Sequence, residues 1–300
     1  VKKQEYTNAS TTQLVNAKTN DWDYDLIAKL GYPRDIFLPI EMPGTEVGHL
    51  SQTIQDQVGF DCSVVLPATH DTGAAVMAVP SLSDDTLYIS SGTWSLMGTE
   101  LKTANCSPDS MACNFTNEGG YDHRYRYLKN IMGLWMIQSV RKELSPDEEF
   151  GSICEHAATE TITSIVDAND DRFLAPQNMT AEVQAACRES GQKVPEGIYQ
   201  VAAVIYNSLA KCYADTVREI EKIEHVTYPC INIVGGGANA AYLNELTAKA
   251  TGKTVYAGPT EATAIGNIMA QMIAAGELQD LAEARKCVFH SFEIKEEKGC

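Results

Sequence analysis

The chain has 300 residues, enough for two domains, and 44% of them are hydrophobic, so a sizeable core can be buried. Forty acidic and 23 basic side chains give a formal net charge of −17, and no Lys/Arg cluster appears, which argues against a nucleic-acid partner. No apolar run is long enough to span a membrane, and nine cysteines without a C-x-x-C pair predict reduced thiols in a cytoplasmic protein, not a zinc site.

In chain order, the first predicted element is a short helix over residues 21–30, with acidic residues in its first turn and Gly31 and Pro33 after its end. Residues 63–67 are predicted to form a brief buried strand, and residues 69–79 the helix that follows it. The polar segment 80–85 is the expected domain boundary, which divides the chain into residues 1–80 and 81–300.

The second unit is predicted to alternate strands and helices, an order that favours an α/β layered domain. Its predicted strands cover residues 86–90, 230–234 and 254–257, and its predicted helices cover residues 125–142, 197–224, 238–251 and 262–275. Residues 117–120, Asn-Glu-Gly-Gly, are expected to form a turn.

The segment 87–96 is the most informative, because an apolar strand runs into a small, hydroxyl-rich turn that contains Gly92. Backbone N–H groups and hydroxyls in such a turn can approach a phosphate closely. Sixteen residues before that strand, Asp71 opens an apolar helix. Transfer of a phosphoryl group to an alcohol requires at least a phosphate-binding turn and a carboxylate positioned beside it. The alternative is structural: Thr69, Asp71 or Thr72 would only cap the helix, and His70 would be a hydrogen-bonded core histidine.

A glycine triplet, Gly235, Gly236 and Gly237, lies between a predicted strand and a predicted helix. Glycines there permit a tight turn whose backbone packs against an anionic ligand at a helix N-terminus. A plain strand–helix turn remains the alternative. The spacing Gly235-x-Gly237-x-x-Ala240 also fits a loose dinucleotide fingerprint, but the acid expected at the end of the next strand is missing, so a dehydrogenase is disfavoured.

Two amides on the predicted helix 125–142 are further candidates. Asn130 and Gln138 are eight residues apart, near one helix face, so both could reach a common ligand. Solvated surface amides are the alternative interpretation.

Taken together, these segments resemble the rhamnulokinases, within the FGGY family of carbohydrate kinases and the actin-like ATPase superfamily. The resemblance is long, and its strings are residues 11–15, 20–23, 91–95, 116–120, 128–135, 171–173, 234–237 and 258–267.

The resemblance implies an α/β protein of the ribonuclease-H-like, actin-like ATPase fold and ATP-dependent phosphorylation of L-rhamnulose at O1. It implies that Asp71 is the general base and that His70, Asp71 and Thr72 contact the sugar. It places nucleotide contacts at Gly92, Thr93, Asn130, Gln138, Gly235, Gly236 and Gly237. The implied small molecules are the sugar, ATP and a magnesium ion that carries much of the phosphate charge.

One departure from the family pattern concerns its first lobe. Members start with an Asp-x-Gly hairpin that grips the phosphates, and no such hairpin precedes Thr11. The expectation is therefore a remnant of the first lobe plus a complete second lobe, inactive or nearly so by itself, with residues 1–80 poorly packed. Another FGGY kinase, for xylulose, fuculose or glycerol, is an alternative, and so is a non-catalytic nucleotide or sugar sensor, which would not need Asp71.

Overall fold

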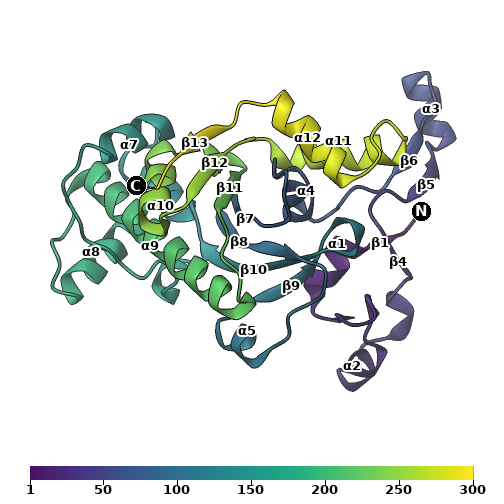
Figure 1. Cartoon of the computed structure of the whole chain (residues 1–300), viewed down its shortest axis with the longest axis horizontal. Helices are drawn as coiled ribbons and strands as arrows, with labels where there is room; N and C mark the ends of the chain where they lie inside the picture. Colours follow the sequence, from purple (N-terminus) through teal and green to yellow (C-terminus); the bar gives the residue numbers. More distant parts are fainter. Residues whose placement is uncertain (300) are drawn as a thin grey trace.

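A seven-stranded mixed sheet is the centre of the computed structural model, which describes residues 1–299 (Figure 1). Its strands in spatial order are β13 (Lys295–Glu297), β12 (Thr254–Ala257), β11 (Cys230–Val234), β7 (Leu87–Ser91), β8 (Trp94–Leu101), β10 (Tyr125–Met132) and β9 (Thr116–Gly119). Strands β12, β11 and β7 run parallel, whereas β7, β8, β10 and β9 pair antiparallel. The parallel strands end at one edge, where α/β folds usually bind ligands.

Both faces of the sheet are buried. Alternate residues of a strand point to opposite sides, so one strand contributes to both core clusters. Leu87 and Ile89 of β7 belong to one core cluster, and Tyr88 belongs to the other. The helices that contribute to the first cluster are α6 (Trp135–Leu144), α7 (Phe150–Ala157), α8 (Met179–Glu189), α9 (Gly197–Glu224) and α10 (Ala241–Thr251). Those of the second are α4 (Asp71–Met77), α11 (Ala262–Ala274) and α12 (Leu281–Ser291).

The segment before α4 is built from short elements (Figure 1). Its three two-stranded sheets pair β1 (Gln4–Glu5) with β4 (Ile40–Glu41), β2 (Val15–Asn16) with β3 (Asp21–Trp22), and β5 (Glu46–His49) with β6 (Ser63–Val65). Its helices are α1 (Tyr6–Ala9), α2 (Tyr24–Lys29) and α3 (Gln52–Val58), and α5 (Pro108–Ala112) lies later, between β8 and β9. Trp22, Ala9 and Ile27 form a small separate core there.

The predicted helix over residues 125–142 is wrong. Residues 125–132 form strand β10, and helix α6 starts only at Trp135. Strand β10 is paired on both sides and buried on both faces, so its apolar residues do not alternate in the way that marks a half-buried strand. Gly133 follows β10 and lets the chain pass close to β8, because an added Cβ there would lie 2.5 Å from the backbone of Trp94.

Other predictions needed smaller corrections. Residues 117–120 are not a turn, since most of them belong to β9. The strand at residues 63–65 exists but is largely exposed instead of buried. Residues 21–22 form β3, and α2 begins after Asp23, whose carboxylate caps it by accepting from the Leu26 amide at 3.0 Å. Helix α10 starts at Ala241, after a 3-10 turn over residues 236–239.

The predicted helix 197–224 and strands 230–234 and 254–257 are confirmed with the same bounds. The expectation that residues 1–80 pack poorly is wrong for α4, whose residues Ala74 to Met77 are nearly inaccessible to solvent. They pack against α11, where Gly266 lets the two backbones approach, since a Cβ there would lie 1.8 Å from the Ala74 carbonyl oxygen.

Candidate active site

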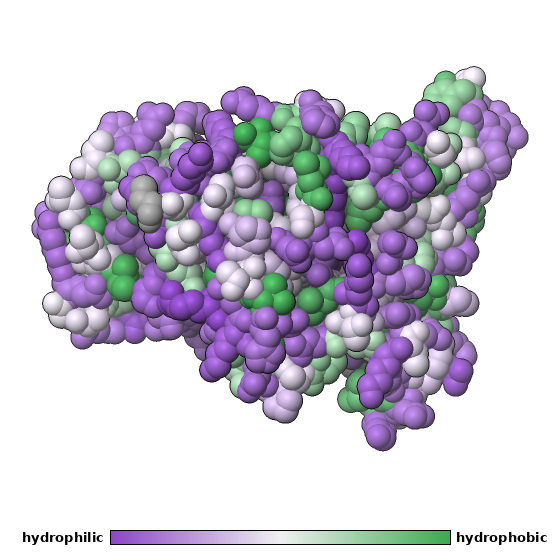
Figure 2. All heavy atoms as spheres, in the orientation of Figure 1, coloured by the Kyte–Doolittle hydropathy of each residue, from purple (hydrophilic) through white to green (hydrophobic). Residues whose placement is uncertain are grey.

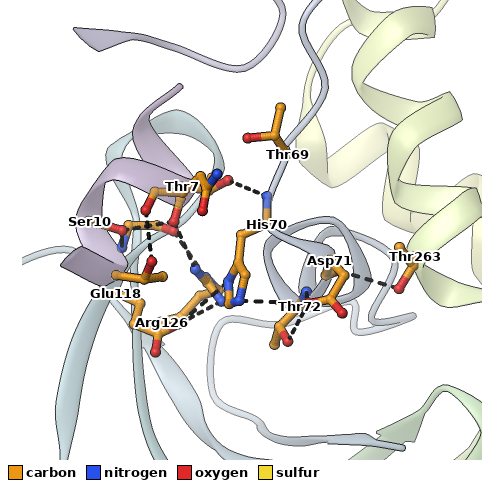
Figure 3. Close-up of polar contacts among 12 residues, drawn as sticks. Thr7, Ser10, Thr69, His70, Asp71, Thr72, Glu118, Arg126 and Thr263 are labelled. Carbon is orange, nitrogen blue, oxygen red and sulfur yellow. Dashed lines mark hydrogen bonds and ion pairs between the residues drawn. The ribbon is translucent and has the colours of Figure 1, made fainter. Parts of the chain in front are cut away.

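Asp71 is the first residue of α4, and Figure 3 shows it beside Thr72 and Thr263. Its Oδ1 accepts from the Thr72 amide at 2.6 Å and from the Thr72 hydroxyl at 3.2 Å. The Thr263 hydroxyl of α11 donates to the Asp71 carbonyl oxygen at 3.3 Å. The side chain is nevertheless 78% exposed, so its carboxylate is oriented from behind and remains open to a ligand.

His70, which precedes α4, is held by helix α1. The Thr7 hydroxyl accepts from the His70 amide at 3.2 Å, and the buried Glu5 carboxylate accepts from the Thr69 amide at 3.0 Å. Burial lowers the pKa of His70, and so does the nearby Arg126 guanidinium, against the opposing effect of three carboxylates. The imidazole is therefore neutral at pH 7.

Gly92 and Thr93 form the tight turn between β7 and β8. The Gly92 amide donates to the Trp94 carbonyl at 2.8 Å. The carbonyls of Gly92 and Thr93 accept from the amides of Leu134 and Trp135 at 3.1 and 3.0 Å. The turn is therefore fixed against the start of α6, as a preformed anion cradle requires.

The three glycines after β11 have different surroundings. Gly235 has a φ of +86°, and a Cβ on it would lie 2.8 Å from the Ser91 carbonyl oxygen. A Cβ on Gly237 would lie 1.9 Å from the Ser91 hydroxyl, whereas a Cβ on Gly236 would meet nothing within 4 Å. The outer two glycines thus allow the loop to pack on β7, and the middle one faces open space.

These segments enclose a cleft of about 610 Å³, a size typical of small-ligand sites. The residues singled out from the sequence that line it are His70, Asp71, Thr72, Gly92, Thr93, Asn130, Gly235 and Gly236. The carboxylates among its described lining residues belong to Asp71 and Glu261, and neither Lys nor Arg lies among them. An anionic ligand would therefore be bound by backbone amides and hydroxyls, with its charge offset by a cation.

Gln138 lines a second cavity, of about 390 Å³, together with Phe150 and Tyr206. Gly92 and Gly236 border both cavities, so the two adjoin. The amides of Asn130 and Gln138 do not share a helix face, because Asn130 lies on β10 and Gln138 on α6. Asn130 lines the first cleft and Gln138 lines the second cavity, so the two amides do not border one common cavity. Gly237 lines neither cavity and packs on Ser91 instead.

Sequence reasoning missed Glu118 of β9 and Arg126 of β10, which lie directly behind His70 (Figure 3). Their side chains form an ion pair of 2.9 Å with no exposure for Arg126 and 11% for Glu118. The arginine between Tyr125 and Tyr127 was the available signal, but the stretch was interpreted as an amphipathic helix.

Within residues 1–299 no group of three or more His, Cys, Asp or Glu side chains is arranged to hold a metal ion. Over the same residues, the helices are all too short or too polar to cross a lipid bilayer.

Residues 1–78 match the N-terminal domain of the FGGY family of carbohydrate kinases, and residues 87–275 match its C-terminal domain. A rhamnulokinase of Oceanobacillus iheyensis is 48% identical over 293 residues, covering 98% of this chain and 62% of the relative. Rhamnulokinases of Halalkalibacterium halodurans and Bacillus subtilis are 49% and 44% identical, with 63% and 60% of the relatives covered. The chain therefore spans about 60% of the length of these relatives.

Solved structures with the same fold are also sugar-kinase-like proteins. A gluconate kinase of Lactobacillus acidophilus superposes with a TM-score of 0.76 at 15% identity, covering 99% of this chain and 60% of that one. Plasmodium falciparum glycerol kinase with ADP superposes with a TM-score of 0.72 at 13% identity, covering 99% and 59%. These likenesses confirm the predicted α/β fold of the actin-like ATPase type. By sequence and by fold, the chain belongs to the FGGY family of carbohydrate kinases.

Proposed function

We propose that the protein phosphorylates L-rhamnulose at its O1 hydroxyl with ATP, giving L-rhamnulose 1-phosphate and ADP. The observation that carries this proposal is the exposed Asp71 carboxylate at the start of α4, in the same cleft as the Gly92–Thr93 turn. A carboxylate can accept a hydroxyl proton only where the hydroxyl can reach it. The turn across the cleft would hold the phosphates of ATP, whose γ-phosphorus is the electrophile.

In the proposed reaction, Asp71 accepts the O1 proton as that oxygen attacks the γ-phosphorus of ATP. The new O–P bond forms while the bond from the γ-phosphorus to the β,γ-bridging oxygen breaks, and ADP leaves with that oxygen. The Thr72 amide and hydroxyl, both bonded to Oδ1 of Asp71, orient the base. Positioning of this kind is the protein's main contribution to phosphoryl transfer.

The proposed nucleotide position follows the two adjoining cavities. The phosphates would lie against Gly92, Thr93 and Gly236, where backbone approach is unhindered. Asn130 would contact the nucleotide from β10. The adenine would enter the second cavity, where Gln138 offers an amide and Phe150 and Tyr206 offer aromatic surface.

A magnesium ion fits the donor set of this cleft. Mg²⁺ at such sites is held by one or two carboxylates together with the substrate phosphates, and Glu261 is the carboxylate on the described walls that the proposed reaction leaves available for it. When bound, it would neutralise charge on the phosphates, which the cleft lacks cationic side chains to do.

An ATP-consuming reaction of this kind belongs in the cytoplasm, where the free thiols of the eight described cysteines would persist.

Relatives named rhamnulokinase are 44 to 49% identical to this chain, which supports rhamnulose as the substrate. A xylulose kinase of Lactobacillus acidophilus, whose solved structure has the same fold, is only 15% identical, so xylulose is less well supported. A sugar or nucleotide sensor would have no need of an oriented, exposed carboxylate at the cleft.

The test is Asp71→Asn in the full-length protein, with ADP release measured in the presence of L-rhamnulose and magnesium. Loss of a general base lowers turnover by about 10²- to 10⁴-fold, while ATP affinity stays within about twofold. Asp85→Asn, at an exposed carboxylate outside the cleft, is the matched control and should leave both unchanged. Wild-type turnover with xylulose but not rhamnulose would redirect the assignment, and full activity of Asp71→Asn would exclude it.

A further inference from the structure

The Glu118–Arg126 ion pair has no part in the chemistry proposed above, yet it is buried beside His70, which lines the cleft (Figure 3). The Arg126 guanidinium is fully buried, and Nε donates to the Gly119 carbonyl at 3.0 Å. Its Nη2 lies 3.5 Å from the Thr7 carbonyl oxygen. Glu118 is thus paired with a buried cation that is itself held by two backbone carbonyls.

His70 lies between two carboxylates. Its Nδ1 is 3.7 Å from Oε2 of Glu118, and its Nε2 is 3.6 Å from Oδ1 of Asp71. The first carboxylate is buried and the second is exposed, at 11% and 78% of the side chain. A movement of about 1 Å would bring Nδ1 and Glu118 to hydrogen-bond distance, and such contacts often tighten only when ligand binds.

We propose that Glu118, fixed by Arg126, is a positioning residue that keeps the single ring proton of His70 on Nδ1. Nε2 then faces the cleft as a hydrogen-bond acceptor. This inference rests on the proposed function in one respect: the group that Nε2 accepts from is a sugar hydroxyl next to the one that reacts at Asp71.

The burial of the two ring nitrogens supports this tautomer. Nδ1 is a buried atom, and Oε2 of Glu118 lies 3.7 Å from it, so a bare lone pair there would face a carboxylate away from water. His70 lines the cleft, where water or a hydroxyl can satisfy Nε2. Oδ1 of Asp71 already accepts two hydrogen bonds from Thr72, which reduces its demand for a third donor.

The consequence for the reaction is that His70 does not compete for the base. A proton on Nε2 would donate to Asp71 and weaken the carboxylate as an acceptor of the sugar proton. The proposed tautomer leaves Asp71 to the substrate. It also links the two family domains, because Glu118 and Arg126 lie in the region matching the C-terminal domain, whereas His70 lies in the region matching the N-terminal one.

The first test is the nitrogen NMR spectrum of the ring in the 300-residue chain, with ¹⁵N-labelled histidine at pH 7.5. The six histidines are distinguished by comparison with His70→Gln, in which one ring's signals vanish. The expected result is a neutral ring protonated at Nδ1. A ring protonated at Nε2 would overturn the proposal without any further variant.

The second test is Glu118→Gln, in which the introduced amide turns its oxygen to Arg126, since arginine only donates, and its NH₂ to Nδ1. The ring proton should then move to Nε2. The matched control is Glu100→Gln, because Glu100 pairs with buried Arg285 at 2.6 Å with the same 11% exposure. The control should leave the His70 signals unchanged, and an unchanged tautomer in folded Glu118→Gln would refute the role assigned to Glu118.

In the full-length protein, Glu118→Gln should raise the KM for sugar about tenfold, the value of one hydrogen bond, with the KM for ATP unchanged. An equal rise in both would mean a general structural effect and would contradict the proposal. Absence of sugar kinase activity in the wild type would remove the proposed function, whereas the NMR result stands or fails on its own.

Discussion

Residues 87–299 and residues 10–66 differ sharply in how they bury apolar side chains. The first region closes two core clusters over both faces of one sheet, with Ile89, Phe173 and Ile205 fully buried. The second leaves large side chains open, among them Ile36 at 58% and Phe60 at 60% exposure. In Figure 2 the α3 end of the molecule carries hydrophobic colour on its protruding surface. Residues 87–299, packed around the sheet, are therefore the rigid region of the molecule, and residues 10–66 are the less packed region.

The candidate base takes its position from the rigid region although its sequence precedes it. Helix α4 lies in the part of the chain that matches the N-terminal domain, yet it packs in the second core cluster with α11 and Tyr88. Asp71 therefore projects from a helix anchored by the sheet. Catalytic groups generally need such support, because small displacements reduce the rate strongly.

The largest effect that would sharpen this comparison is expected from Phe173→Ala. The side chain is fully buried, so its removal should lower the free energy of unfolding by about 3–5 kcal/mol. Phe60→Ala, at an exposed phenylalanine, is the matched control and should change it by less than about 0.5 kcal/mol. Urea unfolding followed by circular dichroism measures both, and equal losses would show that the two regions are not packed differently.

Within the rigid region, Gly237→Ala and Gly236→Ala should separate packing from ligand binding. The first places a Cβ against Ser91 and should cost about 1–3 kcal/mol of stability. The second meets no protein atom and should leave the melting temperature unchanged while weakening ATP binding. Calorimetric titration with ATP tests this, and unaltered affinity in Gly236→Ala would place the nucleotide elsewhere.

In the less packed region, Trp22→Ala should act locally. Trp22 stacks edge-on with Phe37 at 4.9 Å and donates from Nε1 to the Leu38 carbonyl at 2.7 Å. Its loss should speed proteolysis between residues 10 and 45, with a change in global stability below about 1 kcal/mol because the small core is separate. A global loss as large as that of Phe173→Ala would mean that the regions unfold as one unit.

The smallest effect concerns pH. The pKa of His70 is lowered in the folded protein, mainly by burial and then by Arg126. The unfolded chain therefore binds more protons below pH 6.5, so stability should fall as the pH drops from about 6.5. Glu118, Asp71 and Glu5 oppose this shift. Urea midpoints of wild type and His70→Gln at pH 7.5, 6.5 and 5.5 test it, and a steeper fall in His70→Gln would reverse the sign.

The sequence was sufficient where one local signal dominated. The long apolar stripe of α9 and the short β-branched runs of β11 and β12 gave correct bounds. The glycine-rich and hydroxyl-rich turns after apolar strands line the cleft, whereas their predicted contacts with phosphate and nucleotide remain predictions. The substrate roles of Asp71, His70 and Thr72 remain predictions.

Tertiary structure decided what depends on neighbours distant in sequence. Strand β10 resembled a helix because it is buried on both faces, and only its pairing with β8 and β9 makes it a strand. The approach of Glu118 to His70 arises from tertiary packing rather than from sequence spacing. The sequence by itself determined the fold class, the family and the position of the glycine-rich turns that line the cleft. Which side chains share a cleft was decided by the folded sheet, because burial and charge pairing are set by long-range contacts that no local pattern contains.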